Sequence, residues 1–356
     1  MAITASMVKE LRELTGAGMM DCKKALTETN GDMDAAVEVL KRVVAAKAEK
    51  KAARIAAEGI AKVAIDGNTA VVVEVNSETD FVAKNAIFQE FVQAVADKAL
   101  TVDTEKAGDG EDVVSILDMK ADLDDKILKI GEKISIRRFE KVTADVVASY
   151  IHGGGRIGVL VAGNGASDDA AKEALTNIAM QIAAMNPQYI SRDEISADEL
   201  AKMKEITIDS ALNDPFSLPK PVLSKLIEKA VAGVWSAEDV AIYEEKKSNM
   251  NFLPNFLSKE AKAQLAEIAC ADKEEISGNK IFSGLVEGRI SKQMKEICLL
   301  DQVYVKAEDG KQTVAAYLKS VNPALKIAKF VRFEVGEGME KKNEDFAAEV
   351  AKQMNV

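Results

Sequence analysis

The residues of this chain best suited to chemistry or recognition lie in one polar stretch at positions 76–85. A strand-like apolar run ends there, and a helix-like pattern that Ser77 or Thr79 can cap follows it. The candidate side chains are those of Thr79, Asp80, Phe81 and Val82. Loops at strand ends present side chains while the elements behind hold them still, so this position favours a function. The alternative is that Phe81 packs under the following helix, as apolar residues near helix starts usually do.

Residue types that catalyse reactions are scarce elsewhere. The chain has one histidine, His152, and three cysteines without the C-x-x-C spacing of a zinc or redox site. It contains no G-x-S-x-G nucleophile motif and no phosphate-binding G-x-x-x-x-G-K-[ST] loop. The glycines after His152 lie between two predicted strands, so the helix N-terminus that binds phosphate is missing. We therefore expect no catalytic residue, no metal and no cofactor, and interpret His152 either as a polar turn residue or as a protein contact.

Composition and charge narrow the class of partner. The formal net charge of −11 argues against nucleic acid, whose binding needs a basic surface. A local basic segment at residues 47–62 alternates with alanine and is interpreted as a solvated helix face. The chain shows no apolar run of the roughly 18 residues that span a membrane, and no signal-peptide pattern. We therefore expect a cytoplasmic protein that contacts neither nucleic acid nor membrane.

The hydrophobic periodicity predicts an α+β protein that begins with a small helical bundle. Residues 1–55 show three short amphipathic helices followed by a helical linker rich in alanine and lysine. Leu14 falls on the apolar face of the first helix. Met19 and Met20 lie beside two glycines, where they either close the bundle's own core or remain exposed for a protein partner.

A duplicated core is predicted next. Residues 56–142 show a β-β-α-β order, with an Asp-Gly hairpin turn, a helix that ends at about residue 100 and a further helical stretch at 112–130 before the last strand. The same order returns in residues 143–190 together with 297–340. A repeat of this kind indicates one structural theme used twice.

The rest of the chain is predicted to be helical. Residues 191–296 form an insertion, a hairpin enlarged into a subdomain, that prolines break into shorter helices. Its predicted core contains Trp235, Tyr243, Phe252 and Phe256. Residues 341–356 predict a C-terminal amphipathic helix that carries Phe346.

Two long stretches resemble the signatures of bacterial elongation factor Ts. Residues 11–26 (LRELTGAGMMDCKKAL) are similar to its N-terminal signature, and residues 74–83 (EVNSETDFVA) are similar to its second one. Residues 129–132, 150–160 and 330–338 also resemble that family. The resemblance implies a fold with a bundle like a ubiquitin-associated domain, a duplicated core, a dimerisation hairpin and a C-terminal helical module.

The resemblance also implies a function: guanine-nucleotide exchange on elongation factor Tu, without a chemical step of its own. It implies that Asp80 and Phe81 press into the G domain of Tu near its magnesium. It implies further contacts through Arg12, Met19, Met20, Ile130, His152 and Phe346. Shorter members of the family have a compact hairpin at the insertion, so self-association, as a homodimer or as an assembly of two Tu and two Ts chains, stays open.

Two hypotheses from other classes remain. One is a small-molecule enzyme that uses His152 and nearby acids. The other is an adaptor whose residues 1–55 bind ubiquitin-like or nascent polypeptides, since that type of bundle serves such roles elsewhere.

Overall fold

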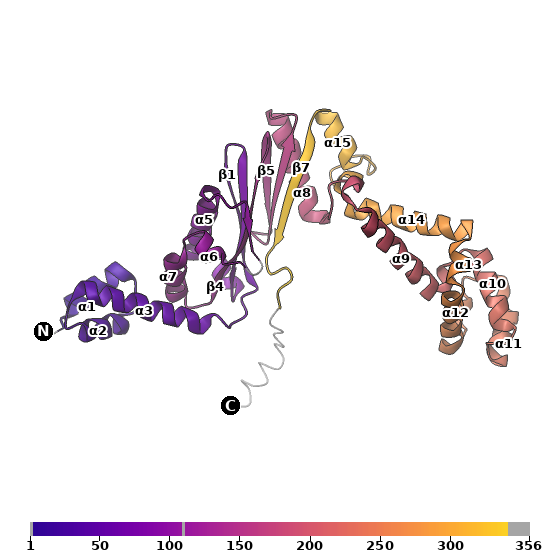
Figure 1. Cartoon of the computed structure of the whole chain (residues 1–356), viewed down its shortest axis with the longest axis horizontal. Coiled ribbons are helices and arrows are strands. Elements are labelled where there is room, and N and C mark those ends of the chain that lie inside the picture. Colours follow the sequence, from indigo (N-terminus) through magenta and orange to yellow (C-terminus); the bar gives the residue numbers. More distant parts are fainter. Residues whose placement is uncertain (1–2, 109–110, 341–356) are drawn as a thin grey trace. The chain divides into compact units, whose positions relative to one another are not determined.

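The computed structural model describes residues 3–108 and 111–340, and the chain divides into two compact units (Figure 1). The first unit contains residues 1–186 and 315–356, and the second contains Pro187–Val314. The first unit combines helices with two antiparallel sheets, whereas the second is largely helical. The predicted α+β class is confirmed.

The first unit begins with the predicted three-helix bundle. Its helices are α1 (Ala5–Thr15), α2 (Met19–Glu28) and α3 (Met33–Lys51). Thr4 and Asp32 cap α1 and α3 by accepting from backbone N–H groups, and Gly16 ends α1 in the left-handed region. Since α3 continues to Lys51, the predicted third helix and most of the predicted helical linker are one helix. Leu11, Cys22 and Leu26 are among the side chains of the small shared core.

The first sheet has the strand order β1-β2-β4-β3, with all neighbours antiparallel. Its strands are β1 (Glu58–Asp66), β2 (Thr69–Ser77), β3 (Lys106–Ala107) and β4 (Ile134–Thr143). The helix α5 (Ala86–Thr101) covers one face and buries Phe88 and Phe91 against β2 and β4. The predicted helical stretch at 112–130 is two helices, because the chain turns at Asp118 (φ 51°) between α6 (Val113–Ile116) and α7 (Lys120–Ile130).

The second sheet repeats the theme with the order β5-β6-β7. Its strands are β5 (Val146–His152), β6 (Ile157–Asn164) and β7 (Lys326–Glu334), with α8 (Asp169–Met185) packed on β5 and β6 and α15 (Val314–Val321) preceding β7. The two sheets share an apolar layer in which side chains such as Val72 and Leu160 are fully buried. The β-β-α-β order occurs twice, as predicted.

A buried carboxylate connects the first sheet with the end of the second. Glu74 on β2 has no solvent exposure and accepts from Arg137 (3.1 Å) and Arg138 (2.6 Å) of β4. It also accepts from the backbone N–H of Gly336, just after β7, at 2.9 Å. A buried charge is tolerated when it is paired and hydrogen-bonded in this way. Arg138 also lies over the Phe333 ring at 4.2 Å, so the sheets are joined by both polar and aromatic contacts.

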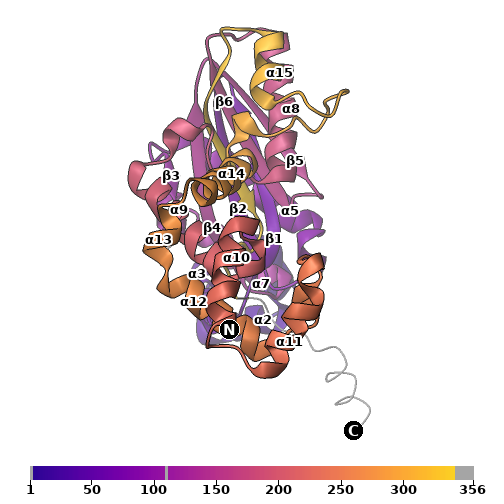
Figure 2. The same cartoon turned by 90° about the vertical axis from the view of Figure 1, so that its right-hand side faces the viewer.

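The second unit has a core of its own. Its helices are α9 (Ala197–Asn213), α10 (Lys220–Val231), α11 (Ala237–Lys246), α12 (Lys259–Ala271), α13 (Lys273–Ser277) and α14 (Lys280–Ile297). Single turns of 3₁₀ helix lie at Arg192–Glu194, Pro215–Ser217, Lys247–Asn249, Leu253–Asn255 and Leu299–Asp301. The helices α9 and α14 pack side by side (Figure 1), and α12 packs against α10 (Figure 2).

Aromatic residues of this unit divide between its core and its surface. Trp235 is buried and donates its indole N–H to the Ala261 carbonyl at 2.9 Å, with Tyr243 packed edge-on against it. Phe252 and Phe256 are exposed, so their predicted place in the core is wrong.

The second unit also extends beyond the predicted insertion at 191–296. An isolated β-bridge joins Tyr189 to Cys298, and a second joins Val303 to Thr313. These bridges fold the flanking segments into the helical unit. Residues 297–314 fall within the second compact unit, Pro187–Val314.

Candidate partner-binding site

Phe81 is presented to solvent by a single helical turn. The helix α4 (Asp80–Ala83) follows β2, and Thr79 caps it by accepting from the N–H of Val82. The Phe81 side chain is 79% exposed, so the alternative that it packs under the following helix is wrong. Val82, on the other side of the turn, is buried in the core and anchors it. The turn thus places one aromatic ring in water while its neighbour holds it to the sheet.

The predicted capping of the long helix is corrected by the same geometry. Asn85 caps α5, whereas Thr79 caps the separate helix α4. Ser77 does not cap either helix; its hydroxyl donates to the Thr79 carbonyl at 3.0 Å. The hydrophobic pattern predicted one helix in place of α4 and α5, because α4 is too short to show a periodicity of its own.

A positive and a negative charge lie beside the exposed ring. Lys84 contacts Asp80 at 2.9 Å, and its ammonium lies 6.0 Å from the centre of the Phe81 ring. The hydrogen bond from Lys84 is the main cause that lowers the pKa of Asp80 below its ordinary value. Asp80 is therefore ionised at neutral pH and carries a negative charge next to Phe81.

Ile130 and His152 differ in exposure. Ile130 is half-buried at the end of α7 and packs against the core, two residues before Glu132, whose carboxylate accepts from Thr79. His152 is exposed at the end of β5, just before the β5–β6 turn, and its Nδ1 lies 3.2 Å from the Tyr150 hydroxyl. The turn that follows Ile130 thus contacts the loop that carries Phe81, through Glu132.

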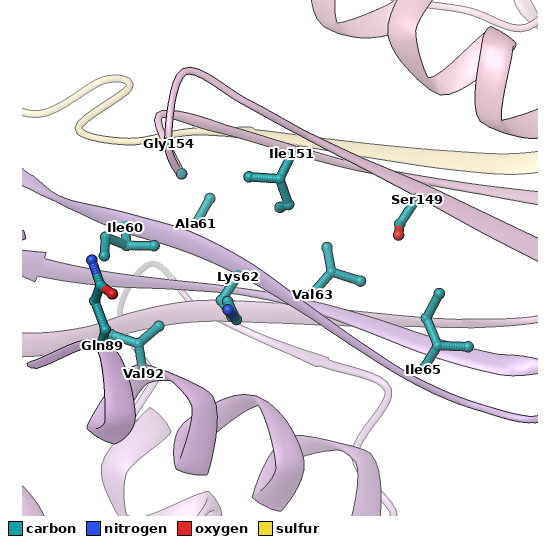
Figure 3. Close-up of a pocket in the computed structure, with 11 residues that line it drawn as sticks. Ile60, Ala61, Lys62, Val63, Ile65, Gln89, Val92, Ser149, Ile151 and Gly154 are labelled. Carbon is teal, nitrogen blue, oxygen red and sulfur yellow. The ribbon is translucent and has the colours of Figure 1, made fainter. Parts of the chain in front are cut away.

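A cavity of about 400 Å³ lies beside this β5–β6 turn (Figure 3). Its walls come from β1, from α5 and from the β5–β6 hairpin, and Figure 3 shows Ala61, Val63 and Ile151 among the apolar side chains that line it. Among the described residues that line it, Lys62 alone is charged, and His152 is not one of them. The cavity therefore offers no acid–base pair to the hypothesis of an enzyme that uses His152.

The N-terminal bundle exposes a second apolar surface. Met19 and Met20, at the start of α2, are both exposed, so the alternative that they close the bundle's core is wrong. Arg12 is exposed as well. Sequence reasoning missed Leu14, which the periodicity assigned to the buried face although its side chain is exposed near the glycines that end α1. Large exposed apolar side chains close together mark interaction surfaces.

Three further observations concern ligands, membranes and the C-terminus. Across residues 3–108 and 111–340, no group of three or more His, Cys, Asp or Glu side chains could hold a metal ion. In the same part of the chain, no helix has the length and apolar character needed to cross a bilayer. Phe346 and the predicted helix at 341–356 lie outside the described residues.

Comparison with known proteins gives consistent matches over nearly the whole chain. The sequence profile of the family described as "Elongation factor TS" matches residues 78–246 and 247–337. The protein named "Elongation factor Ts" from Clostridioides difficile (strain 630) is 42% identical over 360 residues, which cover 99% of each chain. The two matched segments include the exposed Phe81 turn, the helical unit and the part of the duplicated core that follows β2. This chain therefore belongs to the elongation factor Ts family of translation elongation factors.

Proposed function

We propose that this chain is a guanine-nucleotide exchange factor that binds elongation factor Tu in its GDP form and promotes release of the GDP. The observation that supports it best is Phe81, a large aromatic side chain that is 79% exposed on a turn anchored by its buried neighbour Val82. Such a ring gains free energy when a partner covers it. In this proposal, Asp80 and Phe81 enter the G domain of Tu near its magnesium ion and disturb the phosphate region.

The mechanism is a competition between two ligands of Tu. A factor that binds nucleotide-free Tu more tightly than the GDP form must weaken GDP binding by the same ratio. Each tenfold change requires about 1.4 kcal/mol of differential contact. Covering one Phe side chain is worth roughly 1.5–3 kcal/mol. Phe81 therefore accounts for about one to two decades, and greater weakening needs additional contacts.

The additional contacts come from other exposed parts of the first unit. The bundle surface formed by Leu14, Met19 and Met20 docks on the G domain, together with Arg12. Ile130 and His152 add contacts from the core, and Phe346 adds one from the C-terminal segment. Disturbing the magnesium matters because the ion neutralises phosphate charge. The chain itself forms and breaks no covalent bond, and it acts in the cytoplasm, where translation takes place.

Self-association would involve the helical unit, residues 187–314. A homodimer bound to Tu would have two copies of each chain, whereas a monomeric factor would give one of each. The molar mass of the purified complex, measured by light scattering, distinguishes the two.

Release of a fluorescent GDP analogue from elongation factor Tu of the same organism tests the proposal directly. We expect strong acceleration at sub-stoichiometric amounts of this chain, because an exchange factor dissociates and acts again. A folded chain that leaves the release rate of active Tu unchanged would refute the proposed function.

A further inference from the structure

The turn that carries Phe81 is held by a residue from a distant part of the chain. Glu132 lies in the turn between α7 and β4, 53 residues from Thr79. One of its carboxylate oxygens accepts from the backbone N–H of Thr79 at 3.0 Å, and the other accepts from the Thr79 hydroxyl at 2.8 Å. Both bonds of this half-buried carboxylate therefore go to the residue that caps α4.

The orientation of the Thr79 hydroxyl explains why this contact matters for Phe81. A hydroxyl has one hydrogen and two lone pairs. Because Glu132 takes the hydrogen, a lone pair of the same oxygen is left to accept from the Val82 N–H at 3.4 Å. Glu132 thus orients the cap, and the cap orients the turn on which Phe81 stands.

A second glutamate makes the reciprocal contact. Glu78, next to Thr79, accepts from the backbone N–H of Lys133 at 2.6 Å. Each of the two loops therefore supplies a carboxylate to a backbone N–H of the other. We call Glu78, Thr79, Glu132 and Lys133 the brace.

The brace also includes the end of the bundle's last helix. The Lys133 ammonium donates to the carbonyls of Ala52 and Arg54 at 2.6 and 2.8 Å, just after α3. The Arg54 guanidinium contacts the Glu78 carboxylate at 3.2 Å. Glu78 and Lys133 therefore connect the segment that follows α3 with the turn that carries Phe81.

We propose that Glu132 is a positioning residue for nucleotide exchange, which keeps the α4 turn in the conformation that presents Phe81 before the partner arrives. This inference rests on the proposed function and deepens it. The carboxylate does not touch the Phe81 ring; it acts through Thr79. A turn that is already ordered avoids the entropy cost of ordering on binding, which is the general advantage of preorganisation. Without Glu132, each encounter with Tu has to order α4 first.

The test is the variant Glu132→Gln, which has nearly the same shape. Its amide oxygen can still accept from the Thr79 backbone N–H, but its NH₂ group cannot accept the Thr79 hydroxyl hydrogen, which fixes the orientation of the cap. We expect the exchange rate at limiting concentrations of this chain to fall about tenfold, equivalent to about 1.4 kcal/mol. Thr79→Val, which removes the hydroxyl, should fall as Glu132→Gln does, and Thr79→Ser, which restores the hydroxyl, should recover most of the lost rate.

A matched control is available in the second unit. Glu199 also caps a helix start: one of its carboxylate oxygens accepts from the backbone N–H and the hydroxyl of Ser196 at 3.0 and 2.8 Å, and the other accepts from the Tyr189 hydroxyl at 3.2 Å. Glu199→Gln therefore makes the same chemical change at another carboxylate that accepts from a backbone N–H and a hydroxyl, far from Phe81 in the sequence. We expect it to leave the exchange rate unchanged.

A double-variant comparison separates positioning from general stability. If Glu132 acts through Phe81, then Glu132→Gln should cause no further loss in a chain that already carries Phe81→Ala. Amide hydrogen exchange over residues 79–84 of the free chain should also become faster in Glu132→Gln, because the cap no longer protects the Val82 N–H.

Equal loss from Glu132→Gln in the presence and absence of Phe81 would overturn the inference, and so would unchanged amide exchange. If the original chain accelerates GDP release and Glu132→Gln does so equally well, only this inference fails. If the original chain does not accelerate release at all, the proposed function fails with it.

Discussion

Replacing Phe81 by alanine should separate folding stability from partner binding. The ring is 79% exposed, and α4 is anchored through Val82 instead, so the substitution removes little packing from the free chain. Exposed substitutions of this kind usually change the free energy of unfolding by no more than about 0.5 kcal/mol. If Tu covers the ring, its removal costs roughly 1.5–3 kcal/mol of binding free energy. That loss corresponds to a roughly ten- to hundredfold slower exchange at limiting concentrations of this chain.

The assay is the initial rate of release of a fluorescent GDP analogue from elongation factor Tu, with the thermal unfolding temperature measured on the same preparations. Phe256→Ala is the matched control. Its ring is also exposed, at 51%, and a lysine ammonium (Lys246) lies 5.0 Å from its centre, as Lys84 lies near Phe81. We expect Phe256→Ala to leave both quantities unchanged. Equal exchange rates for the two variants would refute the assigned role of Phe81, and so would a loss in Phe81→Ala that is fully explained by unfolded protein.

Two further predictions concern stability. Glu74→Ala leaves Arg137 and Arg138 without their shared buried acceptor. The free energy of unfolding measured with urea should therefore fall by about 3–5 kcal/mol, and a fall of less than about 1 kcal/mol would contradict this account. Burial opposes ionisation of Asp239, but hydrogen bonds, first that from the Ser258 N–H, outweigh it and lower its pKa below 3.8. The ionised form therefore stabilises the helical unit at neutral pH. This contribution to the free energy of unfolding should disappear as the pH falls from about 3.8 through the lower pKa of the folded state. Unfolding curves of Asp239→Asn should not show this loss.

Local patterns were sufficient for most of the fold. The Asp-Gly pair between two β-branched runs predicts the β1–β2 hairpin, and Gly67 does adopt a positive φ of 58° there. The repeated β-β-α-β order predicts two sheets of the same design. These features are local because turn chemistry and side-chain periodicity act over a few residues. The family signature around Phe81 is likewise a property of contiguous sequence.

Periodicity could not decide which apolar side chains stay exposed. Phe81, Leu14 and Phe256 each follow an apolar pattern, yet each is exposed. A side chain is buried only if another element covers it, and that depends on where chain segments distant in the sequence are placed. The break at Asp118 has a similar origin, since residues on both of its sides, such as Val113 and Ile127, pack into one core.

The polar contacts that support the candidate site are also products of tertiary structure. The sequence alone determines the family, the duplicated core and the loop that carries Phe81. Only the folded chain brings Glu132 to Thr79 across 53 residues, and Glu74 to Gly336 across 262. Hydrogen bonds require donor and acceptor within about 3 Å and in line, a condition that no spacing in the sequence encodes. The sequence therefore determined which loop is presented, and the tertiary structure decided what holds it in place.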